Sequence, residues 1–444
     1  MSIKKSIPIF AFLFITIFEP PFLPIPLIYL QAVFDFIYIF TIFINSRNKI
    51  KLRIFDNSEM NKYLYLVIML AILLTVDRLV DIIFFNGDLS SSNWLKSINQ
   101  LIVLTFIEFV NISIIIRCLH INKFKFNDLL YMIVNVGVLQ GIISIFAFIF
   151  PKFRTILLTF AGDIYTNSWM LERRGYGFSL SLLDGFGFGM GLIAGIIIIN
   201  LEYSSLKNTI CQLIKLFIVI FSITVNSRTG LIITAVAVIL KISISKDLRS
   251  TLIKLPISII IFYIVILALI PLINAGMGST NINVSWMCSD IGGLIKAFFP
   301  SANINTTAVQ AQMTSNPYYN LISSVEFPNS VYQLLFGMGW QVYEGSRIGY
   351  RSDNGFINMI WMFGFIGTIF YYLYNLYIHL KILFKVKNST FVLLIFNFIS
   401  LLIYSIKGRP LGYSSGIVIF YLVIFSATYF IHMNIKDGGV NDTI

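Results

Sequence analysis

The sequence predicts an all-α polytopic integral membrane protein with about 12 transmembrane helices and one long extracytoplasmic loop. Hydrophobic residues make up 57% of the 444-residue chain and charged residues only 12%, whereas soluble globular proteins carry about 25% charged residues. The mean hydropathy is +0.84. So few charges cannot cover a water-facing surface of this size, and the composition therefore excludes a soluble multidomain protein.

The chain lacks the residues that several other classes of protein need. Cys118, Cys211 and Cys288 are too few and too scattered for a disulfide framework or a zinc site. The net charge of +12 is typical of nucleic-acid binding in a soluble chain, but basic residues in a membrane protein mainly set its topology, so we expect no nucleic-acid partner. The apolar run after Lys4 and Lys5 resembles a signal peptide, yet no small-residue cleavage site follows it, and we interpret it as the first span.

Segments of about 20 mostly apolar residues, the length that crosses the hydrocarbon core, define the predicted spans. They lie near residues 7–24, 26–45, 61–85, 99–117, 128–150, 177–200, 209–226, 229–241, 255–275, 355–378, 390–405 and 415–432. We expect helices because a backbone exposed to lipid must satisfy its own hydrogen bonds. The sequence shows no alternating ten-residue pattern of the kind that a barrel needs.

Lysine and arginine predict that both termini are cytoplasmic. With the N-terminus inside, the inner segments hold about 20 of the 32 basic residues and the outer segments about 11. The chain then forms a single membrane domain over residues 1–444, with a long outer loop at 276–354 and a second outer loop at 151–176. No P-loop or dinucleotide fingerprint occurs in the sequence, so we expect any substrate to be already energised and carried in the membrane.

Arginines gather at the predicted outer surface, against the positive-inside tendency. Arg228 lies in Asn226-Ser-Arg-Thr-Gly230 between two spans, and the others are Arg173, Arg174, Arg347 and Arg351. One arginine at a span end often only reaches lipid phosphates, but five together indicate binding of phosphate or pyrophosphate, because a guanidinium pairs bidentately with phosphate oxygens. The outer segments contain no Asp-x-Asp motif. We therefore expect no metal ion and no cofactor, with arginines stabilising the leaving group.

Asp353 is the candidate general base. It follows Arg351 by two residues and precedes the span that begins at Gly355. A carboxylate there could take the proton of a sugar hydroxyl. Ser352, Asp353 and Asn354 are also good helix N-cap residues, so the catalytic and the capping interpretation both stay open. Asp353, Arg228 and Arg351 are the predicted catalytic residues.

Small residues in the sixth predicted span indicate close helix packing. Gly187, Gly191 and Gly195 are four residues apart, which places them on one face of a helix. We interpret this stripe as structural rather than as a binding motif.

These residues, in this topology, resemble the bacterial polysaccharide polymerases of the Wzy type and their relatives, the O-antigen ligases. The motifs that carry the resemblance are Asn226-Ser-Arg-Thr-Gly230, Gly337-Met-Gly339, and Asp353-Asn-Gly-Phe followed by Gly364-Phe-Ile-Gly367. The resemblance implies that the outer arginines engage a lipid pyrophosphate. It also implies that a growing glycan moves from undecaprenyl pyrophosphate to a sugar hydroxyl of another lipid-linked repeat unit.

The same resemblance implies a place in the cell and a set of partners. We expect a multi-pass protein of the bacterial inner (plasma) membrane, with its active site facing the periplasm or the outside. Besides the undecaprenyl-pyrophosphate-linked repeat units and the membrane lipids, the implied partners are a chain-length regulator of the Wzz type and a flippase.

Two other functions stay open. An O-antigen ligase would typically carry a His-Asn-type motif near the end of the long loop, and Asp353-Asn354 stands there instead, which favours a polymerase. A flippase or other transporter for lipid-linked oligosaccharides would have a similar number of spans, but its charges would line a cavity near the membrane midplane, often between repeated halves. The sequence shows no convincing internal repeat.

Overall fold

The computed structural model describes most of the predicted helices and parts of the segments between them. The described residues are 3–20, 33, 35–36, 58–84, 98–99, 101, 105–161, 175–179, 183–201, 205–243, 270–278, 285, 288–289, 291–293, 295–296, 303–304, 327–328, 330–339, 354–386, 388–408, 410–411 and 414–436. Within them, all regular secondary structure is helical.

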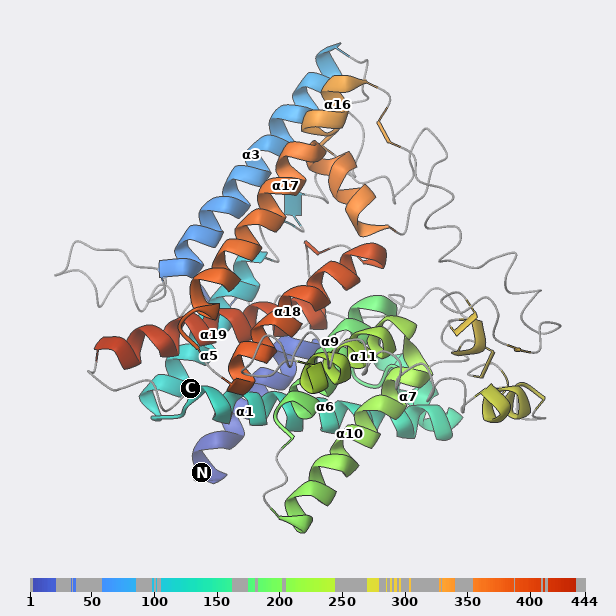
Figure 1. Cartoon of the computed structure of the whole chain (residues 1–444). Coiled ribbons are helices and arrows are strands. Elements are labelled where there is room, and N and C mark those ends of the chain that lie inside the picture. Colours follow the sequence, from blue (N-terminus) through green and yellow to red (C-terminus); the bar gives the residue numbers. More distant parts are fainter. Residues whose placement is uncertain are drawn as a thin grey trace.

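Twelve helices have defined bounds in the described part of the chain (Figure 1). They are α1 (Ile3–Phe18), α3 (Ser58–Phe84), α5 (Thr105–Ile121), α6 (Phe126–Ile149), α7 (Pro151–Ala161), α9 (Leu183–Ile199), α10 (Leu206–Asn226), α11 (Arg228–Ser243), α16 (Val331–Phe336), α17 (Gly355–Leu383), α18 (Asn388–Lys407) and α19 (Ser415–Lys436).

The structure supports a helical membrane protein. Among the described residues, five helices are long and apolar enough to cross a membrane, namely α6, α10, α17, and the stretches Ser389–Lys407 of α18 and Ser415–Met433 of α19. Ten of the predicted spans coincide with described helices, whereas most of the predicted spans 26–45 and 255–275 lies outside the described residues. The count of twelve spans therefore stays a prediction. Residues 151–161 of the predicted second outer loop form α7.

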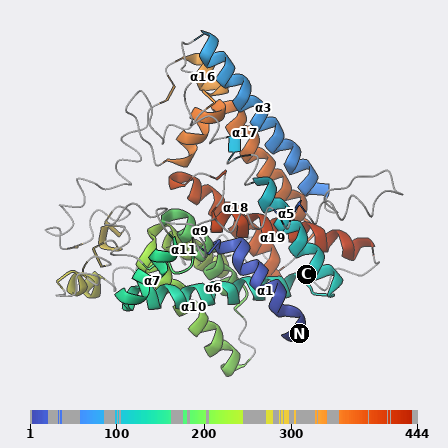
Figure 2. The same cartoon turned by 180° about the vertical axis from the view of Figure 1, so that it is seen from behind.

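Helix α9 is the centre of the structure. All its residues from Gly185 to Ile199 are buried, and it contacts α6, α10, α11, α18 and α19. Figures 1 and 2, which view the molecule from opposite sides, both show these helices grouped together. A helix that is apolar on every face is stable only when other elements or lipid surround it, and α9 meets this condition by central placement.

Glycines let α9 and α11 approach to backbone contact. A Cβ atom added to Gly230 of α11 would lie 2.6 Å from the carbonyl oxygen of Gly187, and one added to Gly191 would lie 3.1 Å from the Cα atom of Gly230. A Cβ atom on Gly195 would overlap the ring of Phe396 on α18. The predicted packing role of the glycine stripe is thus confirmed.

Helix α17 is broken at Gly364, where φ is +64° and ψ is −175°. The break releases backbone carbonyl groups that a continuous helix would use internally, and residues just after α16 replace the missing donors. The amide of Met338 donates to the Trp361 carbonyl (2.7 Å), and that of Gly339 donates to the Met362 carbonyl (3.2 Å). Two motifs of the sequence analysis, Gly337–Gly339 and Gly364–Gly367, therefore meet at this break.

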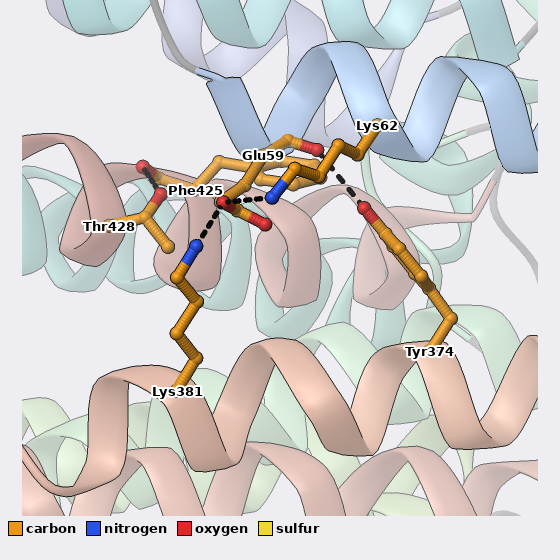
Figure 3. A network of polar contacts seen from close by, with 6 residues as sticks. All are labelled: Glu59, Lys62, Tyr374, Lys381, Phe425 and Thr428. Atoms are coloured by element: carbon orange, nitrogen blue, oxygen red, sulfur yellow. Dashed lines mark hydrogen bonds and ion pairs between the residues drawn. The ribbon is translucent and has the colours of Figure 1, made fainter.

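A carboxylate ties the start of α3 to the end of α17 (Figure 3). Glu59 Oε1 lies 2.5 Å from Lys381 Nζ and 3.1 Å from Lys62 Nζ. The Tyr374 hydroxyl donates to the Glu59 carbonyl at 3.3 Å. The Glu59 side chain is only 5% exposed, so two ammonium groups stabilise a carboxylate that has lost most of its water.

The α9–α11 contact yields a stability prediction. Gly230→Ala should lower the free energy of unfolding by ~1–3 kcal/mol, because the new methyl group meets the backbone of α9, which cannot move aside. Thermal unfolding of the purified protein in detergent measures the effect. Gly278→Ala is the matched control, since its nearest neighbour would be 3.6 Å from the new Cβ atom. Equal melting temperatures for the two variants would contradict the proposed close contact.

Candidate functional site

Arg228 begins α11 directly after the end of α10. Ser227 is the C-cap of α10, with an extended backbone (φ −158°, ψ 132°), so the chain changes direction within one residue and α11 starts at Arg228. The Arg228 side chain is half-buried. A Cβ atom placed on Gly293 would lie 4.0 Å from Arg228 Nη1, so the guanidinium lies beside a segment of the predicted long outer loop.

Asn226 attaches the residue after Arg174 to the α10–α11 junction. Its Oδ1 accepts from the Gly175 amide (3.0 Å), and its Nδ2 donates back to the Gly175 carbonyl (3.0 Å). Nδ2 also lies within donor distance of Ser144 Oγ (2.8 Å) and of the Ser222 carbonyl (2.9 Å). Because the buried Asn226 side chain both accepts from Gly175 and donates to it, it fixes Gly175 in position.

Helix α6 holds the same segment from its other side. Ser144 Oγ donates to the Gly175 carbonyl, and Gln140 Nε2 donates to the Tyr176 carbonyl at 2.7 Å. Gly175 is packed so closely on α6 that a Cβ atom there would lie 2.9 Å from the Phe148 amide nitrogen. Gly175 and Tyr176 are therefore held in the bundle by a set of buried hydrogen bonds.

Asp184 joins the starts of α9 and α11 to the end of α18. Its Oδ1 accepts from Thr229 Oγ1 at 2.7 Å and lies 3.4 Å from Lys407 Nζ. Both ionised side chains are mostly shielded, with exposed fractions of 18% for Asp184 and 19% for Lys407. Shielding costs both groups solvation, so the net gain from forming the pair can be small, but removing Lys407 would leave the Asp184 carboxylate without the cation that compensates it.

The start of α17 lies against the end of α18. A Cβ atom on Gly355 would overlap the carbonyl group of Gly408, the residue after Lys407. Asn354 is the N-cap of α17, and its Oδ1 accepts from the Ile357 amide at 3.2 Å. Among the three capping candidates, Asn354 therefore fills the capping position. Asp353 itself lies outside the described residues.

Several helices present their N-termini at this end of the bundle. Helices α9, α11, α17 and α19 begin at Leu183, Arg228, Gly355 and Ser415, and Ser415 packs on α9, 2.9 Å from where a Cβ atom of Gly189 would lie. The N-terminus of a helix carries a partial positive charge of about half an elementary charge. Together with Arg228, these termini produce a local electrostatic potential that favours anions.

The structure describes one of the predicted site residues, Arg228, and places it at this end of the bundle. The other predicted residues, Arg173, Arg174, Arg347, Arg351 and Asp353, lie outside the described residues. Gly175, which follows Arg174, bonds to Asn226 at the α10–α11 junction, and Asn354, which follows Asp353, caps α17. Asp184 and Lys407 were not predicted as site residues: Lys407 follows the predicted span 390–405, but Asp184 lay within the predicted span 177–200, and α9 begins only at Leu183.

Comparison with models of protein families, with curated proteins and with solved structures gives no match for this chain. Its function must therefore be argued from its own residues.

The Asn226 hydrogen bonds can be tested by hydrogen exchange. In Asn226→Asp the carboxylate can still accept from the Gly175 amide but cannot donate to the Gly175 carbonyl, so residues 175–179 should exchange about tenfold faster. Mass spectrometry of the exchanged peptides measures the change. Asn122→Asp is the control, because Asn122 Nδ2 donates within its own turn, to the Cys118 carbonyl. Unchanged protection of 175–179 in Asn226→Asp would show that α6 alone holds the segment.

Proposed function

We propose that this chain is a polysaccharide (O-antigen) polymerase of the Wzy type. It transfers a growing glycan from undecaprenyl pyrophosphate to a sugar hydroxyl of another undecaprenyl-pyrophosphate-linked repeat unit. The bond between the glycan and the donor phosphate breaks, a new glycosidic bond forms, and undecaprenyl pyrophosphate leaves. The reaction is placed on the outer face of a bacterial inner membrane.

One observation carries the proposal: segments far apart in sequence converge on one end of the bundle. Gly175 follows Arg174 and is bonded to Asn226, two residues before Arg228. Thr229 is bonded to Asp184, which pairs with Lys407. Lys407 precedes Gly408, on which the start of α17 packs. The described anchors of three sequence motifs thus form one connected group, as a shared site requires.

The electrostatics of this end suit a diphosphate leaving group. A departing pyrophosphate gains negative charge in the transition state, and groups that are already oriented stabilise that charge at little cost of reorganisation. Arg228 contributes a permanent positive charge at a helix N-terminus. In the proposal, Arg173, Arg174, Arg347 and Arg351 complete the pyrophosphate-binding set.

Asp353 is assigned as the general base in this proposal. The cap of α17 is Asn354, so the preceding carboxylate is not required for the helix start. As a base it would accept the proton of the attacking sugar hydroxyl while the pyrophosphate leaves. Arginines supply the charge stabilisation, and the proposed reaction therefore needs no metal ion.

The arginine role predicts a specific defect in cells. Arg228→Ala and Arg228→Lys should reduce polymerisation about 100-fold, because an uncharged or non-planar group stabilises the departing diphosphate poorly. Long glycan chains should disappear while lipid-linked single repeats accumulate, as gel electrophoresis and lipid extraction would show. Arg117→Lys, an exposed arginine at the end of α5, is the control.

The same strains separate a polymerase from a flippase. In a polymerase defect the accumulated repeats face outward, because transport is intact, whereas a transport defect leaves them facing the cytoplasm. Inward-facing repeats, or chains of normal length in both Arg228 variants, would rule out the proposed role.

The role of Asp353 can be tested with purified protein and a synthetic undecaprenyl-linked repeat. Asp353→Asn should slow transfer about 100-fold, and wild-type activity should survive a chelator of divalent cations. Asn354→Asp keeps a capping oxygen and serves as the control for the helix start. Near-normal turnover of Asp353→Asn would assign the base to another residue, and loss of wild-type activity in chelator would reveal a metal requirement.

A further inference from the structure

A cavity lies at the opposite end of the helix group from Arg228. Its volume is about 340 Å³, within the range of small-ligand sites. The cavity lies between α6, α9, α10 and the start of α18, and its polar lining residues are Asn127, Tyr131, Asn200, Gln212, Lys215 and Ser389. Asn200 follows the end of α9 and Ser389 opens α18, whereas Asp184 and Lys407 mark the other ends of these two helices.

Lys215 brings a positive charge into this cavity. Its Nζ lies 2.7 Å from Asn135 Oδ1 and 4.5 Å from the centroid of the Tyr131 ring. Within the described part of the chain, no carboxylate lies within ion-pair distance of this ammonium group. A half-buried lysine among apolar helices requires a counter-ion, and a carbonyl oxygen and an aromatic face neutralise its charge only in part.

Gln212 is the second residue of the cavity whose polar side chain is not fully satisfied. Its Oε1 is buried and has no hydrogen-bond donor among the described residues. It lines the same cavity as Lys215, one turn away on α10. A ligand that satisfies both groups must offer an anion to Lys215 and a hydroxyl or ammonium donor to Gln212.

We propose that the cavity binds the headgroup of an anionic phospholipid whose phosphate carries a hydroxylated substituent, such as phosphatidylglycerol. The phosphate pairs with Lys215, and a headgroup hydroxyl donates to Gln212. The side chains beside the cavity fit acyl chains: Leu213, Ile214 and Phe217 of α10 are 48%, 55% and 67% exposed. Tyr131 of α6, which lines the cavity, is 54% exposed. A membrane lipid therefore reaches this cavity from the side, and the site is independent of the proposed polymerase activity.

Native mass spectrometry of the full chain in detergent tests the proposal. The probes are phosphatidylglycerol, phosphatidylmethanol, which has the same charge but no hydroxyl group, and inorganic phosphate. Lys215→Gln should weaken binding of both lipids about tenfold. Gln212→Leu should lower the affinity for phosphatidylglycerol to that for phosphatidylmethanol and leave the latter unchanged. The matched control is Lys207→Gln, which removes the same charge from the exposed first turn of α10.

Three results would overturn the proposal. Lipid binding that is equal in wild type and Lys215→Gln would show that the lipid does not bind in this cavity. Equal loss in Lys207→Gln would reduce the effect to general surface charge. Binding of inorganic phosphate that depends on Lys215 and displaces phosphatidylglycerol would identify a soluble anion, not a lipid, as the ligand. All three variants must elute as the wild-type monodisperse species, so a folding defect is recognised separately.

Discussion

The backbone contact between α9 and α11 is the constraint on which the rest of the site depends. Without side chains at Gly187, Gly191 and Gly230, the two helices approach until backbone atoms touch. In a lipid environment helix association relies on close packing and hydrogen bonds, because there is little hydrophobic driving force between helices. This contact sets Thr229 within 2.7 Å of Asp184 and so fixes where Arg228 begins α11. Any side chain at these glycines would displace the charged end of α11.

Buried hydrogen bonds between helices stabilise the bundle in addition to the close contacts at glycines. The Tyr421 hydroxyl contacts that of Tyr63 and lies 3.0 Å from that of Tyr371, which donates to the Pro410 carbonyl at 2.8 Å. Tyr371 thereby connects the interior of α17 to the turn that follows Lys407. Asn397 Nδ2 of α18 donates to the Phe420 carbonyl of α19 at 3.2 Å. Polar groups that are satisfied inside an apolar bundle hold helices in one register, because any shift would leave them unpaired.

Much of the helical framework could be predicted from the sequence, because span lengths and caps are local properties. The predicted starts at 355 and 415 agree with the structure, where Asn354 and Ser414 accept hydrogen bonds from the first turns of α17 and α19. The break of α17 at Gly364 was not predicted, since a glycine within an apolar run does not reveal its φ angle. The Asp184–Lys407 and Asn226–Gly175 pairs were also missed. They join residues that are far apart in the sequence, and no periodicity encodes them.

The position of Arg228 is set by the helices that surround the start of α11. Helices α9, α10, α11 and α18 form a rigid base of buried hydrogen bonds, an ion pair and oriented N-termini. Asp184 is engaged by Lys407 and Thr229, so its carboxylate is held beside the first turn of α11, which begins at Arg228. A pyrophosphate site of the proposed kind needs positive charge held in a fixed position, because groups that are already oriented stabilise a leaving group at little cost of reorganisation. In the proposed polymerase, the junction at Arg228 provides this position.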